Sequence, residues 1–416
     1  MQTIVRAADA AEFLALVPEL FGFQPTNSMA VIAFRGKRTC GALRFDLPTS
    51  VPDRQLKRFL SQQLGTMCKI PGIDGVLAVV YTDEPFGTET TPPCSALLAA
   101  FRNRAVHMGL VVKETLCIAS DGWASALDPD TPLGGHPLTE IPEVTLGLPG
   151  VCRPTGDQHG EADRVPPDLA RVERVGTAHG RLTRLLDGLN DAPAPCGVGG
   201  AREVEAAEVY RRDIAALEPL IVPTLLFEHA LAVGANGLSA EEVALVLIAL
   251  RGPDIRDVAL MQWAYGADYG QVALSGADTL AAARALGVDQ ELIEAAAAIE
   301  VDDSEASCLD GVAESARRMS GEGPRPDHSR ISRAIALLLD VVDAAPRSAR
   351  PAPLTVLSWL NWAVGHNTRA DDCARGALAI EPGYGLAGLM ITMLEHGRFP
   401  EWLFERPEHD EGSVDA

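Results

Sequence analysis

The chain is short of basic side chains. Its 416 residues include 35 lysines and arginines against 57 aspartates and glutamates, which gives a formal net charge of −22. Because binding to DNA depends on basic side chains that neutralise phosphates, we expect no nucleic-acid partner. Positions 1–150 hold 12 basic and 15 acidic residues, a net of −3, so the remaining −19 lies in residues 151–416. This asymmetry predicts two parts with different surfaces.

Clustered cysteines are also lacking. The eight cysteines are far apart and no C-x-x-C pair occurs, so zinc ribbons and thioredoxin-like redox sites have no support. Isolated cysteines of this kind are typical small buried residues in a reducing compartment. We therefore expect neither a metal nor another cofactor.

Long apolar runs are missing too. The strongest, Val243–Leu250, has eight residues, whereas a membrane-spanning helix needs about 20. At the start of the chain, Arg6 is followed by Asp9, Glu12 and Glu19, which interrupt an apolar segment of the kind found in secretion signals. We expect a cytoplasmic protein that does not bind membranes.

The first 150 residues alternate between helical and strand patterns. Apolar residues at helical spacing predict helices, and short apolar runs bounded by turn residues predict strands. Strand 75–81 is apolar throughout, which indicates burial on both faces and parallel pairing. The expected order is helix 9–21, hairpin strands 29–34 and 40–47, helix from 52, strand 75–81, helix 95–108, strand 110–119 and a return strand from 123. We expect an α/β layer domain with a mixed sheet, ending near residue 150.

Helices alone are expected after a stretch rich in proline and glycine at 128–167. We assign residues 151–200 to an irregular linker with one helix, 201–405 to an all-α domain and 406–416 to an acidic disordered tail. The clearest helix start is at Ser239, which forms a capping box with Glu242, while Leu238 and Val243 form a hydrophobic staple.

The C-terminal part has the spacing of a helix pair. Leu357, Gly365, Ala370, Ala377 and Pro382 follow a pattern that resembles the tetratricopeptide repeat, with small residues where two antiparallel helices cross. The aromatic positions of that repeat are absent, and a generic helical hairpin explains the spacing equally well. We expect one such pair within a larger helical domain.

Four stretches in the same order resemble the actinobacterial DUF4192 family of proteins of unknown function. They are residues 14–32, 79–83, 255–257 and 353–384. The resemblance implies no activity, since the family has none established to carry over. Many members have a short cysteine cluster after the Asp-Gly turn, where this chain has residues 125–130 without cysteine, so a metal or redox role would not carry over from it.

No recognised catalytic motif is present: G-x-S-x-G, P-loop, H-E-x-x-H and EF-hand patterns are all absent. Gly197–Gly200 is the nearest to a phosphate cradle, but it follows prolines and no strand, so a linker explains it better. His136, His159 and Cys152 lack the spacing of a zinc site. Asp128 and Asp130 with Asp121 can bind a cation or act as acid and base, or can simply form turns.

Three groups of residues remain as candidate sites. Asp46, Asp83 and Asp121 fall at predicted strand ends, where open sheets bind ligands. Asn27 and Ser28, in the turn after the first helix, have donors for a ligand, although turn formation accounts for them as well.

Arg256 and Asp257 form the third group. Neighbours on a helix point about 100° apart, so we expect each to have its own partner: a helix cap for Asp257, and a carboxylate or ligand for Arg256. An ion pair between helices is the alternative.

Two classes of function are compatible with the sequence. One is a non-catalytic interaction or regulatory protein, whose acidic helical domain binds a protein partner. The other is an enzyme or small-molecule-binding protein with an unrecognised site at the strand ends of the α/β domain. Because catalytic motifs are absent, we favour the first. A pocket that gathers two of the candidate carboxylates, or one of them with Arg256, would favour the second.

Overall fold

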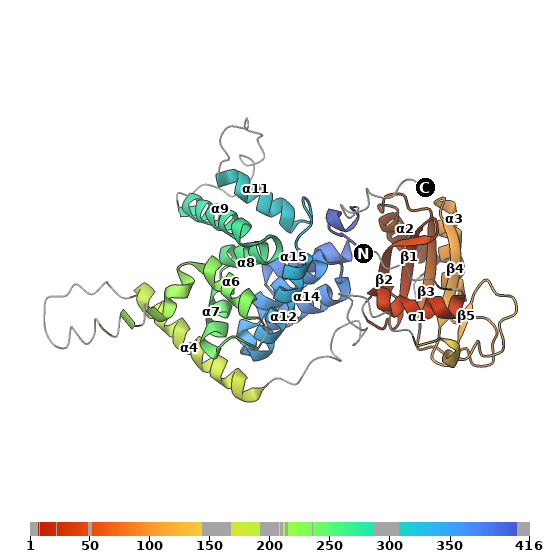
Figure 1. Ribbon diagram of the computed structural model, residues 1–416, viewed down its shortest axis with the longest axis horizontal. Coiled ribbons are helices and arrows are strands. Elements are labelled where there is room, and N and C mark those ends of the chain that lie inside the picture. Colours follow the sequence, from red (N-terminus) through yellow and green to blue (C-terminus); the bar gives the residue numbers. More distant parts are fainter. Residues whose placement is uncertain are drawn as a thin grey trace. The chain divides into compact units, whose positions relative to one another are not determined.

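The computed structural model describes residues 9–21, 23–48, 52–143, 168–191, 215–234, 236–285 and 308–405, with positions 7, 208, 211 and 212 besides (Figure 1). The described residues up to 143 form an N-terminal unit, and those from 168 to 403 form a helical unit. The order is an α+β unit followed by an all-helical one, which confirms the predicted fold class.

The N-terminal unit is built on a five-stranded sheet in the order β2-β1-β3-β4-β5. β3 pairs antiparallel with β1 and parallel with β4, so the parallel pairing predicted for it holds on one side only and the sheet is mixed. The strands are β1 (Ser28–Arg35), β2 (Arg38–Asp46), β3 (Gly75–Tyr81), β4 (Val111–Ile118) and β5 (Trp123–Ser125). The predicted hairpin is β1 and β2.

Helices cover both faces of this sheet. Side chains alternate between the faces along a strand, so Val31 packs toward α2 and α3 while its neighbour Ile32 packs with Leu14 of α1. The helices are α1 (Ala10–Phe21), α2 (Asp53–Met67) and α3 (Ser95–His107). The complete burial of β3 follows from this double cover.

After β5 the described chain continues to residue 143 without further helices or strands except a short 3-10 turn, η1 (Leu138–Glu140). Trp123 and His136 form an isolated β-bridge, and their rings stack with centroids 4.7 Å apart. The remainder of the proline- and glycine-rich stretch, and the predicted tail at 406–416, lie outside the described residues.

The helical unit contains no strand among its described residues. Its α-helices are α4 (Leu169–Asp191), α6 (Pro223–Val233), α7 (Ala240–Arg251), α8 (Pro253–Tyr265), α9 (Ala267–Ala285), α11 (Cys308–Met319), α12 (His328–Ala344), α13 (Pro351–Ala363), α14 (Asn367–Ile380) and α15 (Gly385–Glu395). Its 3-10 turns are η2 (Glu218–Leu220), η3 (Arg347–Ala349) and η4 (Glu401–Leu403).

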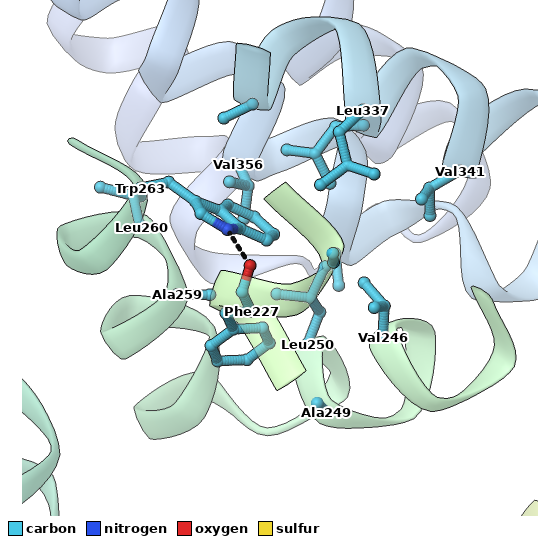
Figure 2. Packing of buried hydrophobic residues seen from close by; sticks show 14 of the residues in the cluster. Phe227, Val246, Ala249, Leu250, Ala259, Leu260, Trp263, Leu337, Val341 and Val356 are labelled. Atoms are coloured by element: carbon cyan, nitrogen blue, oxygen red, sulfur yellow. Dashed lines mark hydrogen bonds between the residues drawn. The ribbon is translucent and has the colours of Figure 1, made fainter. Parts of the chain in front are cut away.

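One hydrophobic core runs through the helical unit. The run Val243–Leu250 on α7 is buried on every side, as a helix apolar all round must be. Figure 2 shows Val246 and Leu250 of this run near the indole of Trp263, whose Nε1 donates to the carbonyl of Phe227 at 3.1 Å. That bond satisfies the one polar group of a fully buried tryptophan.

α4 is part of this core. Val175 and Leu182 on α4 are buried in it. The helix predicted inside the linker at 151–200 therefore belongs to the helical unit, because its apolar face packs there.

The predicted start of α7 is confirmed. The Ser239 hydroxyl accepts from the Glu242 N–H at 3.2 Å, and the Glu242 carboxylate accepts from the Ser239 N–H at 2.8 Å. Leu238 and Val243, the expected staple, are both buried in the core. These reciprocal bonds satisfy two N–H groups that a helix start otherwise leaves free.

α13 and α14 form the predicted C-terminal helix pair. Ala370 and Ala377 on α14 are buried, and the Ser358 hydroxyl of α13 donates to the carbonyl of Ala370 at 2.7 Å, so the two backbones lie close together. Its assignment to the tetratricopeptide class stays a prediction. Within the described ranges, none of the helices combines the length and the apolar character that crossing a bilayer requires.

Candidate functional site

The predicted carboxylates do lie at one edge of the sheet. β2, β3 and β4 run in the same direction, because β1 is antiparallel to both β2 and β3. The end of β2 at Asp46, the turn after β3 at Asp83 and the turn after β4 at Asp121 therefore share an edge. Each carboxylate, however, has a partner of its own.

Asp83 is paired with Asn27. The side-chain carbonyl of Asn27 accepts from the N–H of Asp83 at 3.1 Å, and its amide donates to the Asp83 carboxylate. Asn27 has a φ of 42°, in the left-handed region that asparagine tolerates better than most residues. The pair fixes the turn into β1 against the end of β3. Asn27 therefore has the turn-forming role that was the alternative to ligand binding.

Asp121 and Asp46 are bound locally as well. The carboxylate of Asp121 accepts from the N–H groups of Phe86 at 2.8 Å and Gly87 at 3.1 Å. The hydrogen bond from Phe86, more than any other cause, holds the pKa of Asp121 below its ordinary value. Asp46 is exposed and pairs with the buried Arg44 two residues before it on β2.

Ser28 is wholly buried at the start of β1, opposite Tyr81 of β3. Neither hydroxyl has a hydrogen-bond partner in the part of the chain that the structure describes. Both lie on the sheet face covered by α1.

The prediction that Arg256 and Asp257 each have a separate partner is wrong. They pair with each other: Nε of Arg256 lies 2.9 Å from the Asp257 carboxylate, and Nη2 lies 2.8 Å from it. The expectation from helix geometry was wrong because the long arginine side chain can fold back across its own helix. Burial raises the pKa of Asp257, and the neighbouring guanidinium opposes that rise.

The guanidinium also reaches another helix. Nη1 of Arg256 donates to the hydroxyl of Tyr384, at the start of α15, at 3.1 Å. The group is nearly buried and joins α8 to the C-terminal helices, so its visible role is to hold the helical unit together.

Turn formation is confirmed for Asp128, whose carboxylate accepts from the N–H of Asp130 at 2.9 Å. His136 lies 3.8 Å from the same carboxylate. Over the described ranges, no group of three His, Cys, Asp or Glu side chains is placed to hold a metal ion. Cys152, His159 and Gly197–Gly200 lie outside those ranges.

A pocket of about 310 Å³ opens beside the start of α3, on the sheet face opposite α1. One wall is a single stripe of α3, formed by Ser95, Leu98, Ala99 and Arg102. These residues stand at i, i+3, i+4 and i+7, the spacing of one helix face. The other wall combines β4 with residues 125–131, which the bond from the Ala126 N–H to the Thr115 carbonyl holds at 2.8 Å.

Several polar groups in this pocket have no partner. Thr115 is 1% exposed and lines the pocket, yet its hydroxyl makes no hydrogen bond with any described residue. The hydroxyls of Thr90, Thr91 and Ser95 and the guanidinium of Arg102 likewise bind nothing within the described ranges. Thr90, Thr91 and Arg102 are exposed and Ser95 is half-buried, so solvent can hydrate these four groups. Because buried polar groups are normally hydrogen-bonded, Thr115 is the residue among the five that points to a missing polar occupant.

Among the described residues, no side chain caps the start of α3, and its N-cap, Cys94, has a φ of 62°. The Ser95 N–H donates to the carbonyl of Pro92 and the Leu98 N–H to that of Cys94, both at 3.1 Å, which leaves the N–H groups of Ala96 and Leu97 without an acceptor in the described chain. The pocket thus combines a helix N-terminus, an arginine with no carboxylate partner in the described chain, several hydroxyls and one carboxylate, Asp128.

The nearby thiols are not activated for catalysis. Burial raises the pKa of Cys94 and raises that of Cys117 to about 12, so both are protonated at neutral pH, whereas a nucleophilic cysteine needs a lowered pKa. Among the pocket-lining residues the only carboxylate is Asp128, and there is no histidine. The lining therefore provides binding groups without the acid and base pair of a hydrolase or transferase.

None of Asp46, Asp83, Asp121, Arg256 and Asp257 lines this pocket. The pocket residues were not predicted from the sequence, because its serine, threonine and arginine residues belong to no motif of fixed spacing. A weak signal exists: Ser95, Ala99 and Arg102 fall on one face of a helix preceded by Thr90 and Thr91. This spacing indicates a pocket only when β4 is known to lie beside α3.

An α+β unit with a polar pocket, followed by an all-helical unit, is the class of protein that the structure defines. The chain matches the sequence model of the family described as Domain of unknown function (DUF4192) over residues 11–297 and 270–401. It belongs to that family. No curated protein and no solved structure matches it.

Proposed function

We propose that the chain is a non-catalytic, cytoplasmic regulatory protein whose N-terminal unit binds a small polar molecule in the pocket beside α3. The observation that carries the proposal is the side chain of Thr115, a residue 1% exposed that lines the pocket and whose hydroxyl has no hydrogen-bond partner among the described residues. A hydrogen bond from a ligand to this hydroxyl would contribute about 0.5–1.5 kcal/mol to binding.

Binding is favoured over catalysis by the chemistry of the lining. Its one carboxylate, Asp128, already accepts a backbone N–H, and the two nearby thiols are held protonated by burial. The candidate carboxylates at the strand ends are bound to local partners outside the pocket. An enzymatic role for them remains the alternative proposal.

Analysis of small molecules released from the protein tests this proposal. The full chain is purified rapidly from its native host and denatured, and the supernatant is analysed by mass spectrometry. Ala99→Trp should fill the pocket and abolish the co-purifying molecule. Ala96→Trp, at an exposed position of α3 outside the lining, is the matched control and should retain it. Loss from both variants, or no molecule from the wild type, would refute the proposal.

A protein partner for the helical unit is a second proposal. Residues 286–307 contain seven acidic residues and no basic one, which favours a basic partner. Ile221 and Leu225, next to and within the first turn of α6, are about two-thirds exposed, at 69% and 67%. Affinity purification of the full chain from its host should recover a basic protein that dissociates at high salt. Recovery of the free chain alone would contradict it.

A further inference from the structure

We propose that the ligand of the pocket beside α3 carries an anionic group, a phosphate or a carboxylate, held by Arg102, Ser95 and the N-terminus of α3. This inference rests on the proposed small-molecule binding and adds the chemical class of the molecule. It is carried by the guanidinium of Arg102, the N–H groups at the start of α3, the Thr115 side chain and the volume of the pocket.

The lining holds one cationic side chain, Arg102, and one carboxylate, Asp128, at its other end. Arg102 lines the pocket and pairs with no carboxylate in the described chain. It stands two turns after the start of α3, a helix of 13 residues whose N-terminus has no side-chain cap. A helix N-terminus carries a partial positive charge and binds anions through its free N–H groups, which in the described part of α3 are those of Ala96 and Leu97.

The lining contains hydroxyls, which both donate and accept hydrogen bonds, and the guanidinium of Arg102, which only donates. The hydroxyls of Thr90, Thr91, Ser95 and Thr115 are all free to donate within the described structure. The only carboxylate, Asp128, is engaged by the Asp130 N–H and faces His136. The guanidinium and the N–H groups of the first turn of α3 require acceptors, and phosphate or carboxylate oxygens accept several hydrogen bonds each.

The side chain of Thr115 is an observation independent of the helix N-terminus. It comes from β4, on the wall opposite α3, and the residue is 1% exposed. An ion at the α3 terminus alone would leave this group unpaired.

The pocket is also larger than a simple anion requires. Its volume of about 310 Å³ compares with about 30 Å³ for one water in the liquid. The ligand therefore extends beyond its anionic group, from α3 toward Thr115.

Titration of the full chain with simple probes tests the inference. Inorganic phosphate is followed by ³¹P NMR line broadening, with acetate as the carboxylate probe and glucose as the neutral one. We expect the wild type to bind phosphate or acetate and not glucose. Arg102→Ala should weaken that binding about tenfold or more, since a charge-assisted bond is lost. Arg102→Lys keeps the positive charge and should bind the anion more tightly than Arg102→Ala, although less tightly than the wild type.

Arg58→Ala is the control for net charge. Arg58 is an exposed arginine on α2 that does not line the pocket, so its replacement should leave anion binding unchanged. Circular dichroism establishes that each variant is folded. Equal binding by the wild type and Arg102→Ala, or equal weakening by Arg102→Ala and Arg58→Ala, would overturn the inference.

The result also separates this inference from the proposed function. If a neutral molecule is released from the purified chain while neither phosphate nor acetate binds, small-molecule binding stands and the anionic class is wrong. If nothing is released and none of the three probes binds, the proposed function itself fails. If acetate binds and phosphate does not, the anionic group is a carboxylate.

Discussion

The side chain of Arg256 donates a hydrogen bond to the hydroxyl of Tyr384, 3.1 Å away and 128 residues later in the chain. The two residues lie in stretches that carry the family resemblance, 255–257 and 353–384, and the structure brings those stretches together. The guanidinium also pairs with Asp257 and is nearly buried. Both stretches therefore have a structural role in the helical unit.

Tyr384→Phe should destabilise the helical unit by about 1–2 kcal/mol, because a hydrogen bond to a charged group is lost while Asp257 still compensates the guanidinium. Urea unfolding followed by circular dichroism measures the loss. The comparison is Tyr81→Phe, which removes a buried hydroxyl that has no partner among the described residues. That change should be neutral or stabilising. A Tyr384→Phe protein as stable as the wild type would contradict the assigned role.

The helical unit should lose stability in acid through Glu228. The bidentate bonds from Arg330, at 2.7 and 3.0 Å, lower the pKa of Glu228 below its ordinary value of 4.5. A carboxylate whose pKa is lower in the folded state stabilises that state above the ordinary value, and the effect is lost as pH falls through the folded value.

Glu228→Gln should accordingly lower the Tm at pH 7, and the difference from the wild type should shrink below about pH 4. Differential scanning calorimetry across this pH range measures it. Glu322→Gln, at an exposed glutamate with no side-chain bond within the described residues, should change the Tm little at any pH. A difference for Glu228→Gln that stays constant with pH would contradict the account.

Gly270 of α9 should not tolerate alanine. A Cβ there would lie 2.5 Å from Oε1 and 2.8 Å from Cβ of Gln262, a fully buried side chain that donates to the carbonyl of Thr224. We expect a loss of about 1–3 kcal/mol from overpacking. Gly180→Ala, on α4 with open space around it, should instead stabilise by about 0.5–1 kcal/mol. Calorimetry measures the stability of both variants. Equal changes in stability would contradict the overpacking expected at Gly270.

Local chemistry predicted most of the fold. The Ser239–Glu242 capping box, the β1–β2 hairpin and the order of elements to β5 depend on neighbouring residues, and each is found as expected. The pairing of β3 on both sides was not fully predictable, because a continuous apolar strand is compatible with either direction. The burial of α4 depends on partners far along the chain, so its sequence alone resembled a linker helix.

The candidate site was less predictable. Strand-end positions correctly placed Asp46, Asp83 and Asp121 at one edge, but their partners, such as Asn27 for Asp83, come from distant residues. The pocket is assembled from α3, β4 and residues 125–131, and its residue types are common ones. Only the tertiary structure shows that Thr115 and Arg102 line the same cavity without partners in the described chain.

The most direct measurement is a ¹H–¹⁵N NMR titration of the isotope-labelled full chain with inorganic phosphate. The account predicts saturable shifts of the amides of residues 95–98 at the start of α3 and of Thr115, and no saturable shifts in the helical unit. The same titration of Arg102→Ala should show these shifts only at phosphate concentrations about tenfold higher or more. Unshifted α3 amides, or shifts of equal size in both units, would contradict anion binding in the pocket beside α3.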